Sequence, residues 1–178
     1  MAQVWRVYGD VLVGFGTALP AAALAAWALT RWRRSHGVSP WLAQRRSLAE
    51  VGAVVGTVPW LVMTMRPDPA GESRLSLVPI RDLLSLDPSV VPVQVVGNLL
   101  VFAAFGFCAP VRFAALASLA RIGVLAAGCS LAIEVLQFAL DLGRVSAVDD
   151  VLVNAAGAVL AAVLSRRWWA GARPRAAV

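Results

Sequence analysis

The residues best suited to do chemistry in this sequence lie inside apolar segments. The stretch SLAIEVLQFAL, which begins at Ser130, carries Glu134 and Gln137 among aliphatic side chains. These three polar residues follow one another at i, i+4 and i+7, so an α-helix places them on one face. A carboxylate and an amide on one face can bind a polar ligand, transfer a proton or hydrogen-bond one helix to another. Each of these uses requires partners from neighbouring elements.

Two further pairs of polar residues repeat this helical spacing. Gln94 and Asn98 are four residues apart in one apolar segment, and Asp150 and Asn154 are four apart in another. Each pair therefore forms a stripe on one side of a helix. Such stripes are best satisfied inside a membrane when they face one another. The sequence predicts that three helices bring their polar faces together.

The buried polar groups share one depth. Counted from the start of its segment near Val93, Asn98 lies about 9 Å deep at a helical rise of about 1.5 Å per residue. Glu134 lies about as deep below the end of its segment, and Asn154 below the start of its own. An isolated charge at the centre of a membrane helix costs about 2.5–3.5 kcal/mol on insertion scales. Glu134 avoids much of this cost if it faces Asn98 and Asn154, or if Arg144 reaches it.

The composition indicates a membrane protein. Of the 178 residues, 60% are hydrophobic and only 15% are charged, a balance typical of that class. All 16 basic residues are arginines, and they lie in short clusters beside apolar segments, which indicates membrane topology and argues against nucleic-acid binding. Cys108, Cys129 and His36 form no metal motif or disulfide framework, so no metal and no cofactor is predicted.

Five apolar segments are long enough, or nearly so, to cross a bilayer, which takes about 20 residues. Pro20 and Pro59 lie inside the first two segments, and membrane helices tolerate such kinks. Gly52 and Gly56 form a GxxxG pair that permits close helix contact. The sequence therefore predicts an all-α, polytopic membrane helical bundle with about five transmembrane helices. The predicted spans are residues 11–29, 48–65, 93–110, 122–140 and 148–165.

The arginine positions predict how these helices are oriented. The linker at residues 31–46 holds five arginines, residues 111–121 hold two and the tail from residue 166 holds four, which makes eleven. The segments that would lie on the other side of the membrane hold the remaining five. The positive-inside rule places the eleven in the cytoplasm, with the N-terminus outside and the C-terminus cytoplasmic. The outer connection at residues 66–92 is too polar to span. Within it, VPIRDLLSL, residues 78–86, is typical of a short amphipathic surface helix.

Residues 92–160 resemble the VanZ-like family of bacterial membrane proteins, named for a protein linked to teicoplanin resistance. The resemblance rests on VVGNLLVFAAFGF, CSLAIEVLQ and GRVSAVDDVLVNAAGAVLA, in that order and spacing. Upstream, LSLVPI is similar to the family's Asn-Leu-x-Pro-Phe element, with Ser76 in place of the Asn and Ile80 in place of the Phe. In the third span, Ala104 stands where the family usually has a proline.

The resemblance implies a multi-pass protein of the bacterial cell membrane, divided into three regions. Residues 1–75 hold two transmembrane helices with a basic cytoplasmic linker. Residues 76–165 form the VanZ-like region with three transmembrane helices, and residues 166–178 form a basic cytoplasmic tail. The family resemblance also implies a role in the cell envelope and an influence on glycopeptide susceptibility.

The polar residues of the VanZ-like region predict an outward-facing pocket. Arg144 is suited to pair with a phosphate or carboxylate, and Asp149 and Asp150 to bind amines or hydroxyls. The expected partners are membrane lipids, with the head group of a lipid-linked cell-wall precursor as the leading candidate. The predicted ligand-binding residues are Asn98, Ser130, Glu134, Gln137, Arg144, Asp149, Asp150 and Asn154.

Two alternatives stay open. A membrane enzyme acting on a lipid-linked substrate would use Glu134 as general base and Asp149 or Asp150 as acid or metal ligand, although no nucleophile–base pair in the sequence identifies catalytic residues. A structural or assembly protein would use the same polar residues only to set helix register. A transporter is less favoured, because no inverted repeat or clearly broken helix pair is visible. The sequence does not determine the oligomeric state.

Overall fold

Five apolar helical segments dominate the protein. The computed structural model describes residues 2–171 except Ala70, residues 81–83, residues 85–86 and Ser89. Within this part of the chain, five segments are long and apolar enough to cross a membrane, so the predicted all-α bundle of about five transmembrane helices is confirmed. The elements are α1 (Ala2–Ser35), α2 (Pro40–Thr64), α4 (Val91–Val101), α5 (Ala103–Arg112), α6 (Leu119–Ala139) and α7 (Val148–Ser165).

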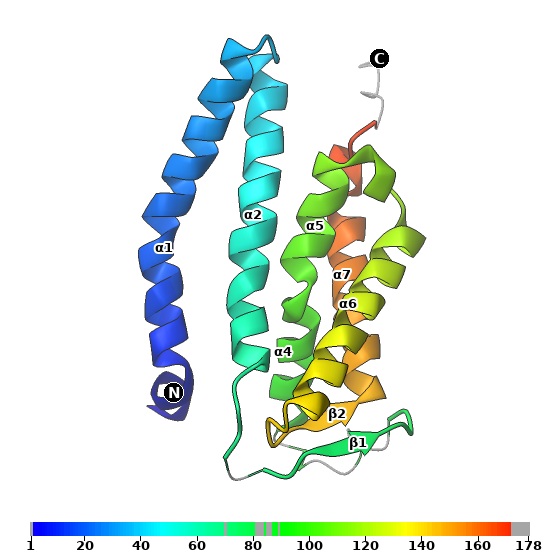
Figure 1. Ribbon diagram of the computed structural model, residues 1–178. Helices are drawn as coiled ribbons and strands as arrows, with labels where there is room; N and C mark the ends of the chain where they lie inside the picture. Colours follow the sequence, from blue (N-terminus) through cyan, green and yellow to red (C-terminus); the bar gives the residue numbers. More distant parts are fainter. Residues whose placement is uncertain (1, 70, 81–83, 85–86, 89, 172–178) are drawn as a thin grey trace.

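The helices pack in a fixed order across the bundle. Figure 1 shows α1 and α2 as a hairpin at one side, with α2 against α5 and with α7 among α4, α5 and α6. The turn between α1 and α2 lies at the same end of the molecule as the short 3₁₀ helix η2 (Arg166–Trp168). The start of α1 lies at the opposite end. The bundle therefore has one arginine-rich end and one end that carries the long 66–92 connection.

Two helices extend beyond the predicted spans. The second span was expected from residue 48, but α2 begins at Pro40, where a proline at the first helical position needs no hydrogen-bond partner for its nitrogen. Likewise α1 continues through Arg33 and Arg34 to Ser35. Hydropathy indicates which residues suit hydrocarbon, whereas backbone hydrogen bonds decide where a helix ends. The two limits differ wherever a helix continues into the polar interface.

The third predicted span is interrupted. Phe102 leaves the helical conformation, with φ −112° and ψ 11°, and separates α4 from α5. The helix resumes at once, because Gly106 donates a backbone hydrogen bond of 2.8 Å to the Phe102 carbonyl. A single continuous span over residues 93–110 was expected, since no glycine or proline stands at position 102 to announce the interruption.

A short parallel sheet closes the end of the bundle that carries the long connection. Strand β1 (Arg74–Ser76) pairs with β2 (Val145–Ala147) in the register Arg74 to Val145 and Ser76 to Ala147. The sheet ties the 66–92 connection to the bridge between α6 and α7 (Figure 1). It was not predicted, because strands of three residues are too short to show a hydrophobic period.

Gly143 makes this closure possible. Its φ of +66° is a conformation that L side chains rarely adopt, and a Cβ atom at this position would lie 2.1 Å from the Asp68 carbonyl oxygen. The Gly143 amide donates to the Ser73 hydroxyl at 2.9 Å, and the Asp68 amide donates to the Leu142 carbonyl at 2.8 Å. Only glycine lets the bridge run this close to the connection.

The predicted amphipathic helix at residues 78–86 falls largely on residues 81–83 and 85–86, which lie outside the described residues.

Small residues allow the helix backbones to touch. A Cβ on Gly157 of α7 would lie 2.0 Å from the Leu99 carbonyl oxygen of α4, and a Cβ on Gly106 of α5 would lie 2.1 Å from the Ala158 carbonyl oxygen. These two contacts fix α7 against α4 and α5 at backbone distance. Such packing drives helix association in lipid, where burial of apolar surface contributes little.

The GxxxG pair of α2 also lies at a helix contact, as predicted. A Cβ on Gly56 would lie 2.4 Å from the Ala104 Cβ, and one on Gly52 would lie 3.2 Å from the Cys108 sulfur. Ala104 occupies the position at which the resembling family usually has a proline. In this chain it packs α5 against α2.

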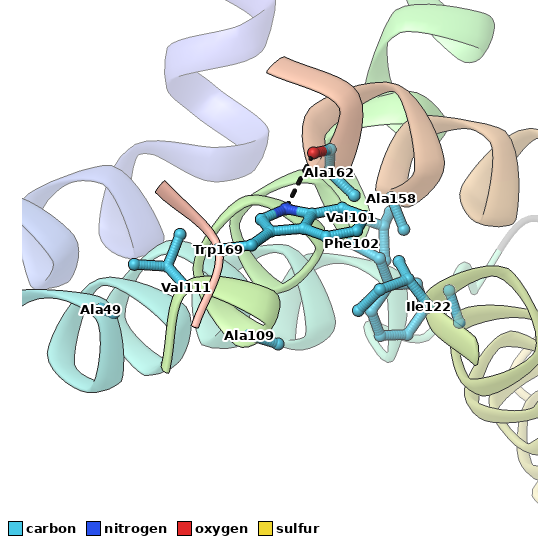
Figure 2. Packing of buried hydrophobic residues seen from close by; sticks show 10 residues of the cluster. Ala49, Val101, Phe102, Ala109, Val111, Ile122, Ala158, Ala162 and Trp169 are labelled. Atoms are coloured by element: carbon cyan, nitrogen blue, oxygen red, sulfur yellow. Dashed lines mark hydrogen bonds between the residues drawn. The ribbon is translucent and has the colours of Figure 1, made fainter. Parts of the chain in front are cut away.

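The buried apolar cluster lies toward the arginine-rich end. Figure 2 shows Trp169 among Val101, Ala158 and Ala162, with its indole nitrogen donating to the Ala162 carbonyl at 3.2 Å. Ile122 of α6 is fully buried against the same cluster. Residues 166–170 therefore fold back onto the bundle after α7.

Gly157→Ala is expected to destabilise the protein, because the new methyl group would overlap the Leu99 carbonyl and force α7 away from α4. Overpacking of this kind typically costs about 1–3 kcal/mol of unfolding free energy. Thermal unfolding in detergent measures the effect. Gly128→Ala is the matched control, since a Cβ atom added to Gly128 would have no atom within 4 Å. Equal melting temperatures for the two variants would contradict the proposed backbone contact.

Candidate functional site

The three polar residues of α6 lie on one buried face, as predicted. Ser130, Glu134 and Gln137 are 0%, 7% and 4% exposed. Their apolar neighbours in the same helix, Leu131 and Val135, are exposed. In a helix that spans a bilayer, an apolar side chain exposed in this way faces lipid and the buried face meets other protein elements.

Glu134 is bonded to the backbone at the start of α7. Its Oε2 accepts a hydrogen bond of 3.1 Å from the Ala147 amide, and its own carbonyl accepts one of 2.9 Å from the Ser146 hydroxyl. Ala147 directly precedes α7, so the Glu134 carboxylate partners an amide at the helix start. The expected partners Asn98 and Asn154 bond elsewhere. Glu134 therefore fixes the end of the bridge between α6 and α7, directly before the first turn of α7, which carries Asp149 and Asp150.

The polar stripe of α4 faces α7. The Asn98 side-chain amide donates to Asp150 Oδ1, and Gln94 Nε2 lies 3.5 Å from the same oxygen. Both contacts cross the interface that Gly157 brings to backbone distance. The prediction that the stripes of these two helices meet is confirmed for this pair.

Asn154 joins α7 to α6. Its Nδ2 donates to the Ser130 hydroxyl at 2.7 Å, and both residues are buried. Its Oδ1 is also buried but has no hydrogen-bond partner in the described part of the chain. An orphaned buried acceptor costs about 1–3 kcal/mol, so this oxygen is a position where a donor from a ligand would be favourable.

Asp149 connects α7 to the long connection. Its Oδ1 accepts a hydrogen bond from the backbone amide of Ile80, which lies in the LSLVPI segment and has a positive φ of 69°. Asp149 is 4% exposed, and its Oδ2 is a second buried acceptor without a partner among the described residues. One oxygen therefore positions the connection while the other is unused.

In the described part of the chain, Arg144 has unused hydrogen-bond donors near Glu134 and Asp150. It is half-buried, and it attracts both Glu134 and Asp150 electrostatically. Within the described residues its guanidinium makes no hydrogen bond or ion pair. The described residues do not form the direct pair between Arg144 and Glu134 that the sequence offered as one alternative, and these two groups interact only at longer range.

Gln137 has a different role from the other predicted residues. Its Nε2 donates to the Thr64 carbonyl at 2.7 Å, and Thr64 ends α2. The hydrogen bond satisfies a carbonyl that has no partner within its own helix. Gln137 therefore joins α6 to α2, one turn nearer the helix end than Glu134.

Sequence reasoning missed the backbone partners of the site and the Ser146 hydroxyl. The amides of Ile80 and Ala147 and the carbonyl of Thr64 carry no side-chain signal. Ser146 could have been noticed, because it stands inside the motif that begins at Gly143. In the described part of the chain, no group of three or more His, Cys, Asp and Glu residues could hold a metal ion.

The eight predicted ligand-binding residues are called the polar cluster below: Asn98, Ser130, Glu134, Gln137, Arg144, Asp149, Asp150 and Asn154. Two cavities lie away from this polar cluster. One of about 450 Å³ lies between α1 and α2, and one of about 200 Å³ lies beside Arg45 at the arginine-rich end. Neither is lined by the eight predicted ligand-binding residues. An open, outward-facing pocket at the polar cluster therefore stays a prediction.

Comparison with known proteins gives one match. A family model described as VanZ/LLP1 matches residues 52–169. The matched region begins inside α2 and ends just after η2, so it covers more of the chain than residues 76–165. No curated protein and no solved structure gives a significant match.

Glu134→Ala is expected to destabilise the protein more than Glu134→Gln. The alanine leaves the buried Ala147 amide without an acceptor, which costs about 1–3 kcal/mol, whereas the glutamine oxygen can keep the hydrogen bond. Thermal unfolding of both variants in detergent compares them directly. Equal losses would mean that the Ala147 amide does not depend on this side chain.

Proposed function

The chain belongs to the VanZ/LLP1 family, and from that premise we propose that it binds a lipid head group at the polar cluster beside β1 and β2. The family and the five apolar helices support a multi-pass membrane protein. The proposed setting is the bacterial cell membrane. The proposed ligand is the head group of a lipid-linked cell-envelope precursor.

The observation that carries this proposal is the unused bonding capacity of the cluster. Asp149 Oδ2 and Asn154 Oδ1 are buried acceptors without donors among the described residues, and Arg144 is a cation without an anion in direct contact there. A ligand that pairs with Arg144 and also donates to these two acceptors must present an anionic group next to hydroxyl or amine groups. A sugar joined to a phosphate has this combination, and guanidinium groups pair well with phosphate oxygens.

The charges of the polar cluster further restrict which head groups can bind there. Among the eight predicted ligand-binding residues, Glu134, Asp149 and Asp150 are acidic and only Arg144 is basic, so a purely anionic ligand would be repelled by the acidic residues. A head group with hydroxyls or amines as well as one anionic group avoids this repulsion, because its donors meet the carboxylates while its anion meets Arg144. This supports a lipid-linked precursor over a simple anionic lipid at this end.

The distribution of arginines supports an exterior position for the cluster. Nine of these arginines, namely those of the linker, of residues 111–121 and at positions 166 and 167, lie at the opposite end, which the positive-inside rule assigns to the cytoplasm. The N-terminus is then outside and the C-terminus cytoplasmic. An exterior site would contact the same lipid-linked precursors on which glycopeptide antibiotics act, and on this basis we propose an influence on glycopeptide susceptibility.

A structural role is the second candidate, and a specific observation favours it. Most polar groups of the cluster already have internal partners: Glu134 bonds Ala147, Asn154 bonds Ser130, and Gln137 bonds Thr64. Such bonds can set helix register without any ligand. The two candidates differ in Arg144, which makes none of these internal bonds.

Arg144→Gln is expected to weaken binding of a lipid-linked disaccharide-peptide precursor by about ten- to a hundredfold, the equivalent of one lost charged hydrogen bond. Its melting temperature should stay near that of the unaltered protein, because the guanidinium holds no internal bond within the described residues. Binding to the purified precursor in lipid nanodiscs is the measurement.

Arg66→Gln is the matched control, because Arg66 lies at the same end but pairs with Asp10 of α1. It should bind the precursor as the unaltered protein does. Retained binding in a folded Arg144→Gln variant, or no precursor binding by the unaltered protein, would leave the structural role as the explanation. Loss of stability in step with loss of binding would favour it as well.

A further inference from the structure

A second charged cluster joins three helices at the arginine-rich end. The two carboxylate oxygens of Glu50 accept hydrogen bonds from Arg33 of α1 and Arg112 of α5. The Arg33 guanidinium also donates to the Ser47 hydroxyl. Glu50 is the only acidic residue of the sequence between Asp10 and Asp68. Both of its oxygens are engaged, so it is not available to neutralise Arg45 of α2.

The charge of Arg45 is incompletely satisfied. Its guanidinium stacks on the Trp41 ring at 4.8 Å, and one terminal nitrogen lies 3.4 Å from the Val111 carbonyl. Its Nε is buried and has no hydrogen-bond partner within the described residues. Leaving a donor on a charged group unpaired is unfavourable. The sequence offers no acid nearby, since residues 31–46, 111–121 and 166–171 contain none.

A cavity of about 200 Å³ opens beside Arg45. Its walls are apolar and come from α2, α5 and η2, with the Phe107 and Trp168 rings 5.7 Å apart at one side. The Arg167 guanidinium stacks over the Trp168 ring at 3.9 Å. The cavity therefore has an apolar interior with a cation on each flank, at the depth where tryptophans mark a membrane interface.

The occupant must combine an anionic group with an apolar chain. We propose that this cavity binds an anionic phospholipid, whose phosphate pairs with Arg45 while the first part of an acyl chain lies against Phe107 and Val111. Basic pockets between transmembrane helices are suited to such head groups. A volume of about 200 Å³ is below the roughly 300–1,000 Å³ of pockets that enclose a drug-sized ligand, so only the chain segment next to the head group enters.

The larger cavity between α1 and α2 lacks a comparable charge. The charged residues that line it, Arg66 and Asp10, pair with each other. No unsatisfied cation among the described residues therefore selects an anionic occupant there. This difference between the two cavities indicates that Arg45 selects an anionic ligand in the smaller one.

The lipid dependence of thermal stability tests the proposal. The purified protein is placed in dodecyl maltoside micelles that contain phosphatidylglycerol or phosphatidylcholine with identical acyl chains. A ligand that binds only the folded state raises its melting temperature, so phosphatidylglycerol is expected to give the larger rise. Arg45→Gln should remove the difference between the two lipids. Arg31→Gln, which changes an exposed arginine stacked on Trp27 at the same end, should keep it.

A second measurement does not depend on the stability of an Arg45 variant. Lipids with brominated acyl chains quench nearby tryptophans, and the difference between the unaltered protein and Trp168→Phe isolates the signal of Trp168. At equal mole fraction, brominated phosphatidylglycerol is expected to quench Trp168 at least twofold more than brominated phosphatidylcholine. Equal quenching, or a lipid-specific stabilisation that survives in Arg45→Gln, would overturn the proposal. Neither readout involves the polar cluster at the other end, so its failure would leave the proposed head-group function intact.

Discussion

The close backbone contact between α7 and the interrupted α4–α5 helix is the constraint on which the rest of the structure depends. Apolar side chains gain little by leaving lipid for protein, so membrane helices associate through close packing and hydrogen bonds. Gly157 and Gly106 permit this packing because any side chain at either position would overlap a carbonyl oxygen of the other helix. With α7 held there, Asp150 reaches Asn98 and Asn154 reaches Ser130.

Glu134 extends this constraint from the helices to their connections. Its carboxylate accepts from the amide that precedes α7, and Asp149, two residues later, accepts from Ile80 in the long connection. A buried carboxylate thus sets the start of α7, and α7 in turn holds the connection over the bundle end. Glu134 and Asp149 act together because each carboxylate accepts a hydrogen bond from a backbone amide.

The charged residues are paired differently at the two ends of the molecule. At the arginine-rich end, Glu50 uses both oxygens to join α1, α2 and α5, and Arg45 keeps an unpaired donor within the described residues. At the other end, the polar cluster keeps, in the described part of the chain, unpaired acceptors on Asp149 and Asn154 together with unused donors on Arg144. One end therefore keeps an unpaired donor, and the other keeps both acceptors and donors. This asymmetry supports two different ligand classes, a head group with hydroxyls or amines at one end and an anionic phosphate at the other.

Much of the architecture could be predicted from the sequence. The apolar segments indicated five spans, and the spacing of Ser130, Glu134 and Gln137 placed them on one face, because hydrophobicity and helical period are local properties of the chain. The same reasoning expected the polar stripes of three helices to face one another, and the stripe of Asn98 does meet α7. It missed the interruption at Phe102 and the β1–β2 sheet, since neither has a period or a breaker residue in the sequence. It also set the start of α2 too late, since hydropathy does not mark where a helix begins in the polar interface.

The sequence by itself determined which segments suit a membrane and which of their side chains are polar. The tertiary structure alone decided which partner each polar side chain binds. Glu134 meets the Ala147 amide, Gln137 the Thr64 carbonyl and Asp149 the Ile80 amide. The physical reason is that amides and carbonyls occur at nearly every residue, so only the folded geometry selects the ones that come within hydrogen-bonding distance.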